Sequence, residues 1–368
     1  MPHVNSSALS PVELAILRLR GLYEQYGYRK YQTGQFEEYG LYLEFKRFLH
    51  SGRILSFTDL DGRLLALKPD VTLSIAKNAR LENGTEKAYY LENVYRESIA
   101  SGTIKEIGQM GLEFFGGDTA YAQAEVLLLA RETLAAIGPD FVLEISHMGF
   151  LTGLFEALGL EADARGKIME ALSAKSPHGV SEAAERAGVA PEGTETLRAL
   201  CRLSGNFQET LAQARALCLN DRMKQALEDL EKTVNAVGEM SGLRLDFTLQ
   251  GDLEYYDGLM MAGYLDGAPK AVLSGGRYDG LMKKLGRPAG AVGFALYLDE
   301  LKRLPREKAE WDVDVLVLAE DGCDVGSLLR TVRNLVNEGL RVRVESKTPP
   351  RLRYARLLRY EKGGLTEC

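Results

Sequence analysis

Residues able to bind a small charged ligand are concentrated in four stretches of this sequence. The stretches are Pro69-Asp70-Val71-Thr72, Arg96 to Glu113, Glu254-Tyr255-Tyr256 and Gly275-Gly276-Arg277-Tyr278. They contain carboxylates, an amide and phenols, which is unusually polar for positions beside strands. If they meet on one sheet face, they line a pocket suited to a small cationic or zwitterionic ligand. Asp70 and Gln109 would then take an ammonium group, and Glu113 and Tyr256 a second polar end.

The second stretch indicates why two of these side chains should point the same way. Ile107 to Glu113 alternates, so Gln109 and Glu113 share one face of a strand. Glu113 directly precedes Phe114-Phe115, which indicates an apolar setting. A carboxylate in such a setting needs a donor partner, because an unpaired buried charge is costly. The alternative is that Glu113 lies on a solvated outer face.

The other members of the set also have plain structural explanations. Asp70 precedes a helical pattern, so it could simply cap a helix. Tyr255 and Tyr256 could be core residues whose hydroxyls are hydrogen-bonded. Gly275-Gly276 could form a turn or a β-bulge. The residues alone leave these alternatives open.

Periodicity and turn residues predict the elements that would position these stretches. Helices are expected from Ser10-Pro11 to Gly27, from a cap at Asp70 or Thr72 to about Arg80, and over Ala120–Ile137. Strands are expected over Ile54–Thr58 and Leu64–Leu67, joined at Asp61-Gly62, and over Ala88–Tyr95, Phe141–Ser146, Leu243–Leu249 and Met260–Leu265. The segment Ala291–Leu301 is expected to become helical.

Two further regions differ in character from the rest. Residues from about 150 to 240 are rich in alanine, leucine and glutamate, which predicts a helical insertion. From Val313 the pattern predicts one strand–helix–strand unit. The arginines after Pro349-Pro350 are interpreted as surface charge; they are Arg351, Arg353, Arg356 and Arg359.

Composition limits the possible class of protein. The chain has 368 residues, 45% of them hydrophobic, and a net charge of −7, which argues against a nucleic-acid-binding surface. No run of about 18 apolar residues and no signal-peptide pattern occur, so a cytoplasmic protein is expected. The cysteines, Cys201, Cys218, Cys323 and Cys368, form no metal-binding motif and are expected to be free thiols.

The order of the motifs resembles the catalytic domain of class II histidyl-tRNA synthetases. The resemblance rests on Tyr95-Arg96-Glu97, the Gln109-x-Gly111-x-Glu113 continuation, Leu253-Glu254-Tyr255-Tyr256, Gly275-Gly276-Arg277-Tyr278-Asp279-Gly280 and Gly293-Phe294-Ala295. It covers roughly residues 10 to 305, apart from much of the insertion. It implies an α+β fold with an antiparallel sheet flanked by helices. Residues 1–305 would form this domain, and residues 306–368 a shortened remnant of the anticodon-binding domain.

The resemblance also implies roles for individual residues. Asp70, Thr72 and Gln109 match positions that hold the α-amino group of histidine. Glu113 and Tyr256, beside Tyr255, match positions that grip its imidazole. Arg96 and Arg277 would belong to a vestigial nucleotide site. No catalytic residue, metal site or cofactor is expected.

Several departures from the synthetases weaken that nucleotide site. Gly251 stands where the synthetases have an arginine, and Glu300 replaces an arginine that faces the ATP phosphates. A carboxylate there repels a triphosphate. Arg96, left without its partner, is expected to pair with a carboxylate such as Glu113 or Glu254. The first synthetase motif, which shapes the dimer interface, lacks its proline, since Gly34-Gln35-Phe36-Glu37 occupies that position.

This combination resembles the regulatory subunits of ATP phosphoribosyltransferase, which are synthetase paralogues in histidine biosynthesis. The resemblance implies a catalytically silent homodimer within a hetero-oligomer, with a short catalytic subunit as partner and histidine as possible effector. Neither nucleic acid nor membrane is expected as a partner. The insertion and the C-terminal unit are both candidate partner surfaces. The alternatives are an amino-acid-activating enzyme like the synthetases, or a free histidine sensor.

Overall fold

The computed structural model describes most of the chain and divides it into two compact units. It describes residues 9–49, 53–81, 84–98, 101–117, 119–238, 241–249, 255–287, 289–304, 310–320, 322–361 and 363–367. One unit is Val12–Leu304, and the other contains the described residues from 310 onward.

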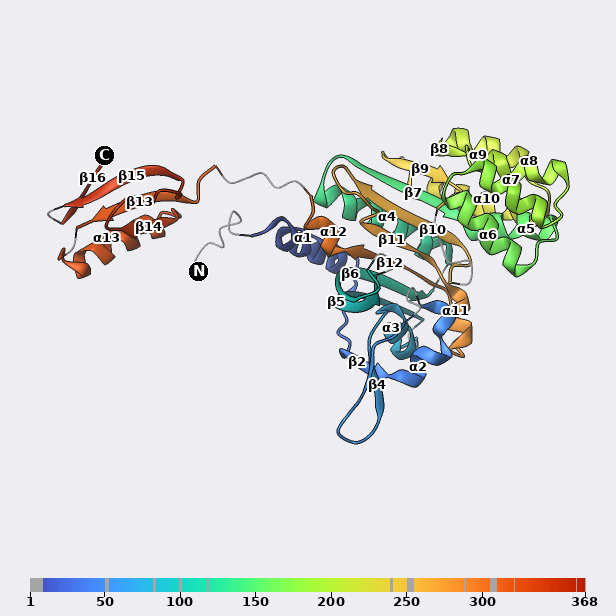
Figure 1. Ribbon diagram of the computed structural model, residues 1–368, viewed down its shortest axis with the longest axis horizontal. Helices are drawn as coiled ribbons and strands as arrows, with labels where there is room; N and C mark the ends of the chain where they lie inside the picture. The colour runs from blue at the N-terminus through green and yellow to red at the C-terminus, as the bar shows by residue number, and fades with distance from the viewer. Residues whose placement is uncertain are drawn as a thin grey trace. The chain divides into compact units, whose positions relative to one another are not determined.

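A nine-stranded sheet forms the centre of the larger unit (Figure 1). In spatial order its strands are β1 (Arg29–Lys30), β5 (Thr85–Glu97), β6 (Ile104–Gly116), β12 (Ala291–Tyr297), β11 (Leu273–Arg277), β10 (Leu259–Leu265), β7 (Phe141–His147), β9 (Leu243–Asp246) and β8 (Ser204–Asn206). Neighbouring strands are antiparallel except for the pairs β1–β5 and β7–β9. The predicted α+β class, with a mainly antiparallel sheet flanked by helices, is confirmed.

The two faces of this sheet carry different cores, as strand β6 illustrates. Met110, Leu112 and Phe114 belong to the larger hydrophobic core, with α1 (Pro11–Gln25) and α4 (Thr119–Ile137). The residues between them point to the opposite face, because side chains alternate along a strand. That second face is covered by α3 (Thr72–Asn78) and α11 (Asp279–Lys284), which contribute to a smaller core. The candidate site lies on the second face.

A small three-stranded sheet adjoins the second core. Its order is β2 (Phe36–Glu38), β4 (Leu64–Leu67) and β3 (Ser56–Thr58); α2 (Tyr39–Glu44) and a short 3-10 helix (Lys46–Phe48) follow β2 in the chain. The hairpin predicted at Asp61-Gly62 is present, and Gly62 has the positive φ of 82° that favours glycine in a turn. Asp59 holds the turn by accepting hydrogen bonds from the backbone N–H groups of Asp61 and Arg63.

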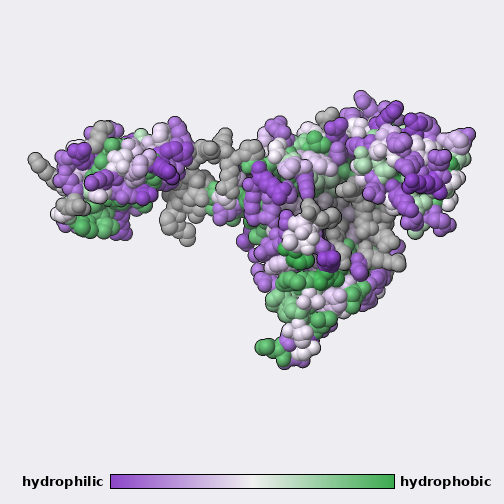
Figure 2. Space-filling model, viewed as in Figure 1, coloured by the Kyte–Doolittle hydropathy of each residue, from purple (hydrophilic) through white to green (hydrophobic). Residues whose placement is uncertain are grey.

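This small sheet and α2 expose an unusual number of large apolar side chains. Figure 2 shows hydrophobic residues gathered on this part of the face in view. The exposed set, here called the apolar hairpin surface, is Phe36, Leu43, Leu55, Phe57, Leu60 and Leu64. Contiguous exposed apolar residues of this kind often mark an interaction surface.

The segment from Met148 to Val237 is mainly helical, as its composition predicted. Its helices are α5 (Met148–Ala157), α6 (Ala162–Ser173), α7 (Pro177–Arg186), α8 (Pro191–Leu200), α9 (Phe207–Ala216) and α10 (Asp221–Val237). Figure 1 shows α6 to α9 gathered beyond the β8–β9 end of the sheet. Ser176, Asn206 and Asn220 cap three of these helices with their side chains.

The C-terminal unit contains more structure than the sequence predicted. The strand–helix–strand unit is present as β13 (Val313–Ala319), α13 (Val325–Asn337) and β14 (Val342–Glu345). Two further strands, β15 (Tyr354–Glu361) and β16 (Gly364–Glu367), complete a four-stranded sheet in the order β14-β13-β15-β16. The prediction missed β15 because its exposed arginines hide an alternation in which Leu358 and Tyr360 are buried.

The segment Ala291–Leu301 is mainly a strand and only ends in a helix. The segment from Ala291 stays a strand as far as Tyr297, and the helix α12 covers only Leu298–Leu301, so the predicted helix was too long. The tail arginines lie at exposed positions, and three of them pair with carboxylates, as Arg353 does with Asp312 at 2.7 Å. None of the described helices is both long and apolar enough to cross a membrane.

Candidate functional site

The register of the central strands places the candidate residues on one face of the sheet. On β6 and β12, Gln109 lies opposite Tyr297, and Glu113 lies opposite Gly293. Residues that pair directly across antiparallel strands point to the same side. Glu113 and Gln109 therefore face the same space as Tyr297, although almost two hundred residues separate the two strands in the chain.

These side chains surround a small inner pocket of about 30 Å³. All six ligand-binding residues predicted from the sequence line it: Asp70, Thr72, Gln109, Glu113, Tyr255 and Tyr256. Arg96 lines it as well. Tyr90, Ser274 and Tyr297 also line the pocket but were not predicted to do so, whereas Tyr278 was named only as part of a polar stretch and without a role. Tyr278 had a signal, since it stands beside Arg277 in one of the four polar stretches.

Glu113 is the buried centre of the inner pocket. Its side chain is 2% exposed, so the alternative of a solvated outer face is wrong. The Thr72 hydroxyl donates to Oε1 at 2.6 Å, and the Tyr278 hydroxyl donates to Oε2. Burial raises the pKa of Glu113 to about 8, against the opposing effect of these hydrogen bonds, and the charge of Asp70 raises it further. At neutral pH this carboxyl group therefore holds a proton.

Gly293 explains how such a large polar group fits beneath the sheet. A Cβ atom at this position would lie 1.8 Å from Oε2 of Glu113. The close approach of the carboxyl to the β12 backbone thus requires glycine there.

Asp70 both caps a helix and faces the pocket. Its Oδ1 accepts the backbone N–H of Leu73 at 2.8 Å at the start of α3. Its other oxygen lies 3.4 Å from the guanidinium of Arg96, whose Nε donates to the carbonyl of Pro69 at 2.6 Å. Arg96 thus pairs with a carboxylate, as expected, but the example Glu113 is wrong, because hydroxyl groups hold Glu113 instead. Glu254, the other predicted partner, lies outside the described residues.

Gln109 contributes to the inner pocket an amide that is unpartnered within the described part of the chain. It is 2% exposed, and its Nε2 has no hydrogen-bond partner among the described residues. An unpartnered buried amide costs free energy that a bound acceptor would recover.

Aromatic rings close the remaining sides of the inner pocket. Tyr255 packs against Tyr256 and Tyr278, with ring centroids 4.7 Å and 5.6 Å away. Burial raises the pKa of each of these three hydroxyls well above its usual value. They therefore stay protonated at neutral pH.

A second, larger space, here called the outer cleft, adjoins the inner pocket. It measures about 830 Å³ and is lined by charged residues of β6, α12 and neighbouring segments, including Lys105, Lys270 and Glu300. Arg96 and Tyr297 line both spaces. Glu300 forms an ion pair with Arg303 at 3.0 Å.

The structure does not bring Arg277 to the other predicted residues. It lines neither the inner pocket nor the outer cleft, and its guanidinium pairs with Asp279 at 2.6 Å. Gly251, the other position singled out for the nucleotide site, lies outside the described residues.

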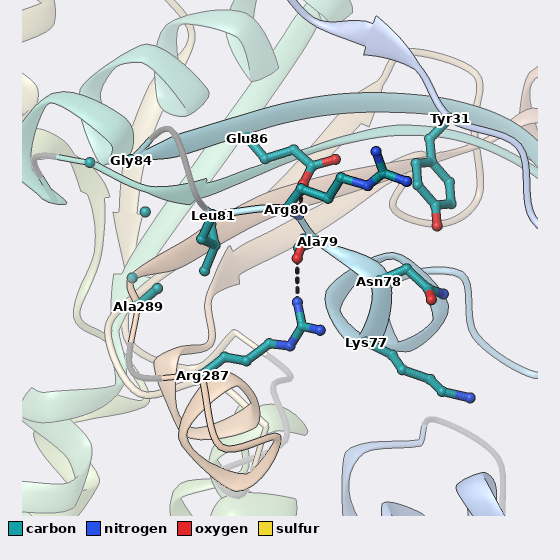
Figure 3. A pocket seen from close by; sticks show the side chains of 13 residues that line it. Tyr31, Lys77, Asn78, Ala79, Arg80, Leu81, Gly84, Glu86, Arg287 and Ala289 are labelled. Carbon is teal, nitrogen blue, oxygen red and sulfur yellow. Dashed lines mark hydrogen bonds between the residues drawn. The ribbon is translucent and has the colours of Figure 1, made fainter.

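A larger cavity than the inner pocket lies elsewhere in the described part of the chain (Figure 3). It measures about 1180 Å³ and is lined by Lys77, Arg80 and Arg287, among others. Figure 3 shows the guanidinium of Arg287 bonded to the carbonyl of Ala79. None of the residues predicted from the sequence lines this cavity.

Comparison with known proteins defines the class to which this fold and site belong. The family model described as histidyl-tRNA synthetase matches residues 6–301. The histidyl-tRNA synthetase from Nostoc sp. PCC 7120 has the same fold, with a TM-score of 0.69 at 21% identity, over 92% of this chain and 82% of that one. The chain therefore belongs to the histidyl-tRNA synthetase family.

More similar relatives narrow the assignment within that class. The ATP phosphoribosyltransferase regulatory subunit of Geobacter metallireducens is 32% identical over 82% of this chain and 72% of that protein. The one from Moorella thermoacetica is 29% identical over 94% and 92%. A crystal structure of an ATP phosphoribosyltransferase regulatory subunit/histidyl-tRNA synthetase from Bacillus halodurans has a TM-score of 0.74 at 25% identity, over 91% of this chain and 88% of that one. The chain belongs to the ATP phosphoribosyltransferase regulatory subunits, as its motifs predicted.

Proposed function

We propose that this chain acts in the cytoplasm as the non-catalytic regulatory subunit that enables a short catalytic subunit of ATP phosphoribosyltransferase. The observation that carries the proposal is its membership of the regulatory-subunit family over most of its length. A solved complex of ATP phosphoribosyl transferase (HisG:HisZ) from Thermotoga maritima shares the fold, with a TM-score of 0.60 at 18% identity. Its two components are consistent with such a partnership here.

The inner pocket is the proposed site for histidine as effector. Asp70, Thr72 and Gln109 would receive the α-amino group, while Glu113 and Tyr256 would hold the imidazole. A volume of about 30 Å³ has room for only one or two water molecules. Histidine therefore binds only if lining side chains other than Tyr297 move apart, and this movement would couple the ligand to the state of the assembly.

Calorimetry with the full chain tests the site. Glu113→Gln should weaken histidine binding by roughly tenfold. A carboxyl group that loses its proton when histidine binds can accept both hydroxyl hydrogen bonds and a third from the imidazole N–H, whereas an amide oxygen cannot. Glu228→Gln, a change of the same kind on the exposed side of α10, is the matched control. Unchanged affinity in Glu113→Gln would place histidine elsewhere, such as at the partner interface.

We further propose that the chain does not form an aminoacyl adenylate. The support is the carboxylate of Glu300 beside the outer cleft, where the synthetases carry an arginine. Pyrophosphate exchange with histidine and ATP is the test. Exchange above background would overturn the proposal, and Glu300→Arg alone should not create activity.

The apolar hairpin surface is the proposed homodimer interface. It includes Phe36, which stands in the segment that shapes the dimer in the synthetases. Leu60→Asp with Phe57→Asp should convert a dimer into a monomer in light scattering, because two charges would be buried without partners. A chain that is monomeric without these changes would refute this proposal.

Co-purification tests the partnership itself. The tagged full chain should retain a short phosphoribosyltransferase that is expressed with it. Deleting the residues after 310, or shortening the insertion, would show which region carries the contact. Failure of the intact chain to retain the enzyme would refute the assignment.

A further inference from the structure

The inner pocket and the outer cleft are separate spaces that meet at two side chains. Arg96 and Tyr297 are the two residues that line both of them within the described part of the chain. A ligand that filled the pocket and continued into the cleft would therefore pass between these two residues.

The charges of the pocket fix which end of an amino acid faces this passage. Arg96 is the one cationic residue among the described residues that line the pocket, whereas Asp70 and Glu113 offer carboxyl groups. The carboxylate of a zwitterion is attracted to the guanidinium and repelled by Asp70. Its carboxyl end consequently faces Arg96 and the outer cleft, and its amino end faces inward.

Tyr297 is held firmly at the same place. It ends strand β12, opposite Gln109, and its backbone N–H donates to the carbonyl of Val272 at 2.7 Å. Its hydroxyl shares a hydrogen bond of 2.7 Å with the hydroxyl of Ser274 on β11. The ring is thus fixed at both ends, by the backbone and by its hydroxyl group.

We infer that Tyr297 is a specificity-determining partition, which admits a free amino acid to the inner pocket and excludes the same amino acid extended at its carboxyl group. The excluded ligands are amides, esters and acyl phosphates with a bulky substituent. A fixed ring in the path of the substituent acts by steric exclusion, which discriminates without any contact to the accepted ligand. The inference rests on the proposed histidine site and states which ligands that site accepts and which it excludes.

Competition binding with the full chain tests this inference. The probes are L-histidine and L-histidine β-naphthylamide, and the variants are Tyr297→Ala and Tyr297→Phe. Tyr297→Phe keeps the ring and removes the bond to Ser274, so it is the matched control. The wild-type chain should prefer histidine by roughly a hundredfold, and Tyr297→Ala should reduce this preference by at least roughly tenfold. Tyr297→Phe should retain most of the preference.

The outcomes separate this inference from the proposal on which it depends. If all three proteins bind histidine and the preference is the same in each, the partition is refuted while the histidine site stands. Equal affinity of the wild-type chain for both probes would also refute the partition. If none binds histidine although each has the circular dichroism of a folded chain, both proposals fail.

Discussion

The protonation of Glu113 makes the stability of the folded chain depend on pH in a way that one substitution should remove. Its pKa is about 8 in the folded chain and has its ordinary value of 4.5 when the chain unfolds. Between these values the folded state holds a proton that the unfolded state has lost. The contribution of Glu113 to stability is therefore greatest below about pH 4.5 and declines until the pH passes about 8.

The size of the effect follows from the pKa difference. Each pH unit within this window costs about 1.4 kcal/mol of unfolding free energy. Between about pH 6 and about pH 8 the loss amounts to about 2 kcal/mol, because the slope flattens near the upper pKa. In Glu113→Gln the side chain keeps its shape but has no proton to release. The variant should therefore become more stable relative to the wild-type chain by about this amount over the same range.

Urea unfolding at several pH values, followed by circular dichroism, measures this difference. Other titrating groups cancel when the two proteins are compared at each pH, so the remaining slope reports on Glu113. Glu228→Gln, which removes an exposed carboxyl group, should show a much smaller change with pH. A stability difference between Glu113→Gln and wild type that stays constant from pH 6 to pH 8 would show that Glu113 is already ionised in the pocket.

Three further predictions concern neighbouring parts of the fold. Lys68 is 1% exposed, and its ammonium group forms an ion pair with Glu92 at 2.5 Å. Lys68→Met should lower the unfolding free energy measured in urea by about 3 kcal/mol, because it leaves the carboxylate without its cation, and a loss below about 1 kcal/mol would contradict this. Gly293→Ala should lower the unfolding free energy by about 1–3 kcal/mol and abolish histidine binding, because its Cβ collides with Glu113; binding at wild-type affinity would count against the site. Burial lowers the pKa of His147 from 6.5 to about 4. Between pH 6.5 and pH 5 the unfolding free energy of the wild-type chain should therefore fall by about 1.5 kcal/mol relative to that of His147→Gln, and the same dependence of stability on pH in both proteins would refute this.

Local patterns were sufficient to predict the site residues that come from single strands and turns. The alternation from Gln109 to Glu113 depends only on the geometry of one strand, and the structure shows both side chains on one face. The hairpin at Asp61-Gly62 depends on one turn, whose positive φ favours glycine. The resemblance to the synthetases then supplied the order in which distant motifs come together.

Features that depend on pairing between distant strands could not be predicted in this way. Tyr297 reaches the site because β12 pairs with β6 in one register, and nothing near Tyr297 in the sequence indicates this. Glu113, named as an example of a carboxylate partner for Arg96, was wrong for a similar reason. Two hydroxyls, from Thr72 and Tyr278, satisfy Glu113 and leave Arg96 to Asp70. The strand β15 was missed because its arginines occupy the exposed half of its alternation.

The most direct test of the account is the rate of phosphoribosyl-ATP formation by a short catalytic subunit, measured with and without this chain and across a range of histidine concentrations. The account predicts that adding the wild-type chain raises the rate, that histidine then lowers it, and that Glu113→Gln keeps the activation but shifts inhibition to higher histidine concentrations. A catalytic subunit whose rate is the same with and without this chain would contradict it.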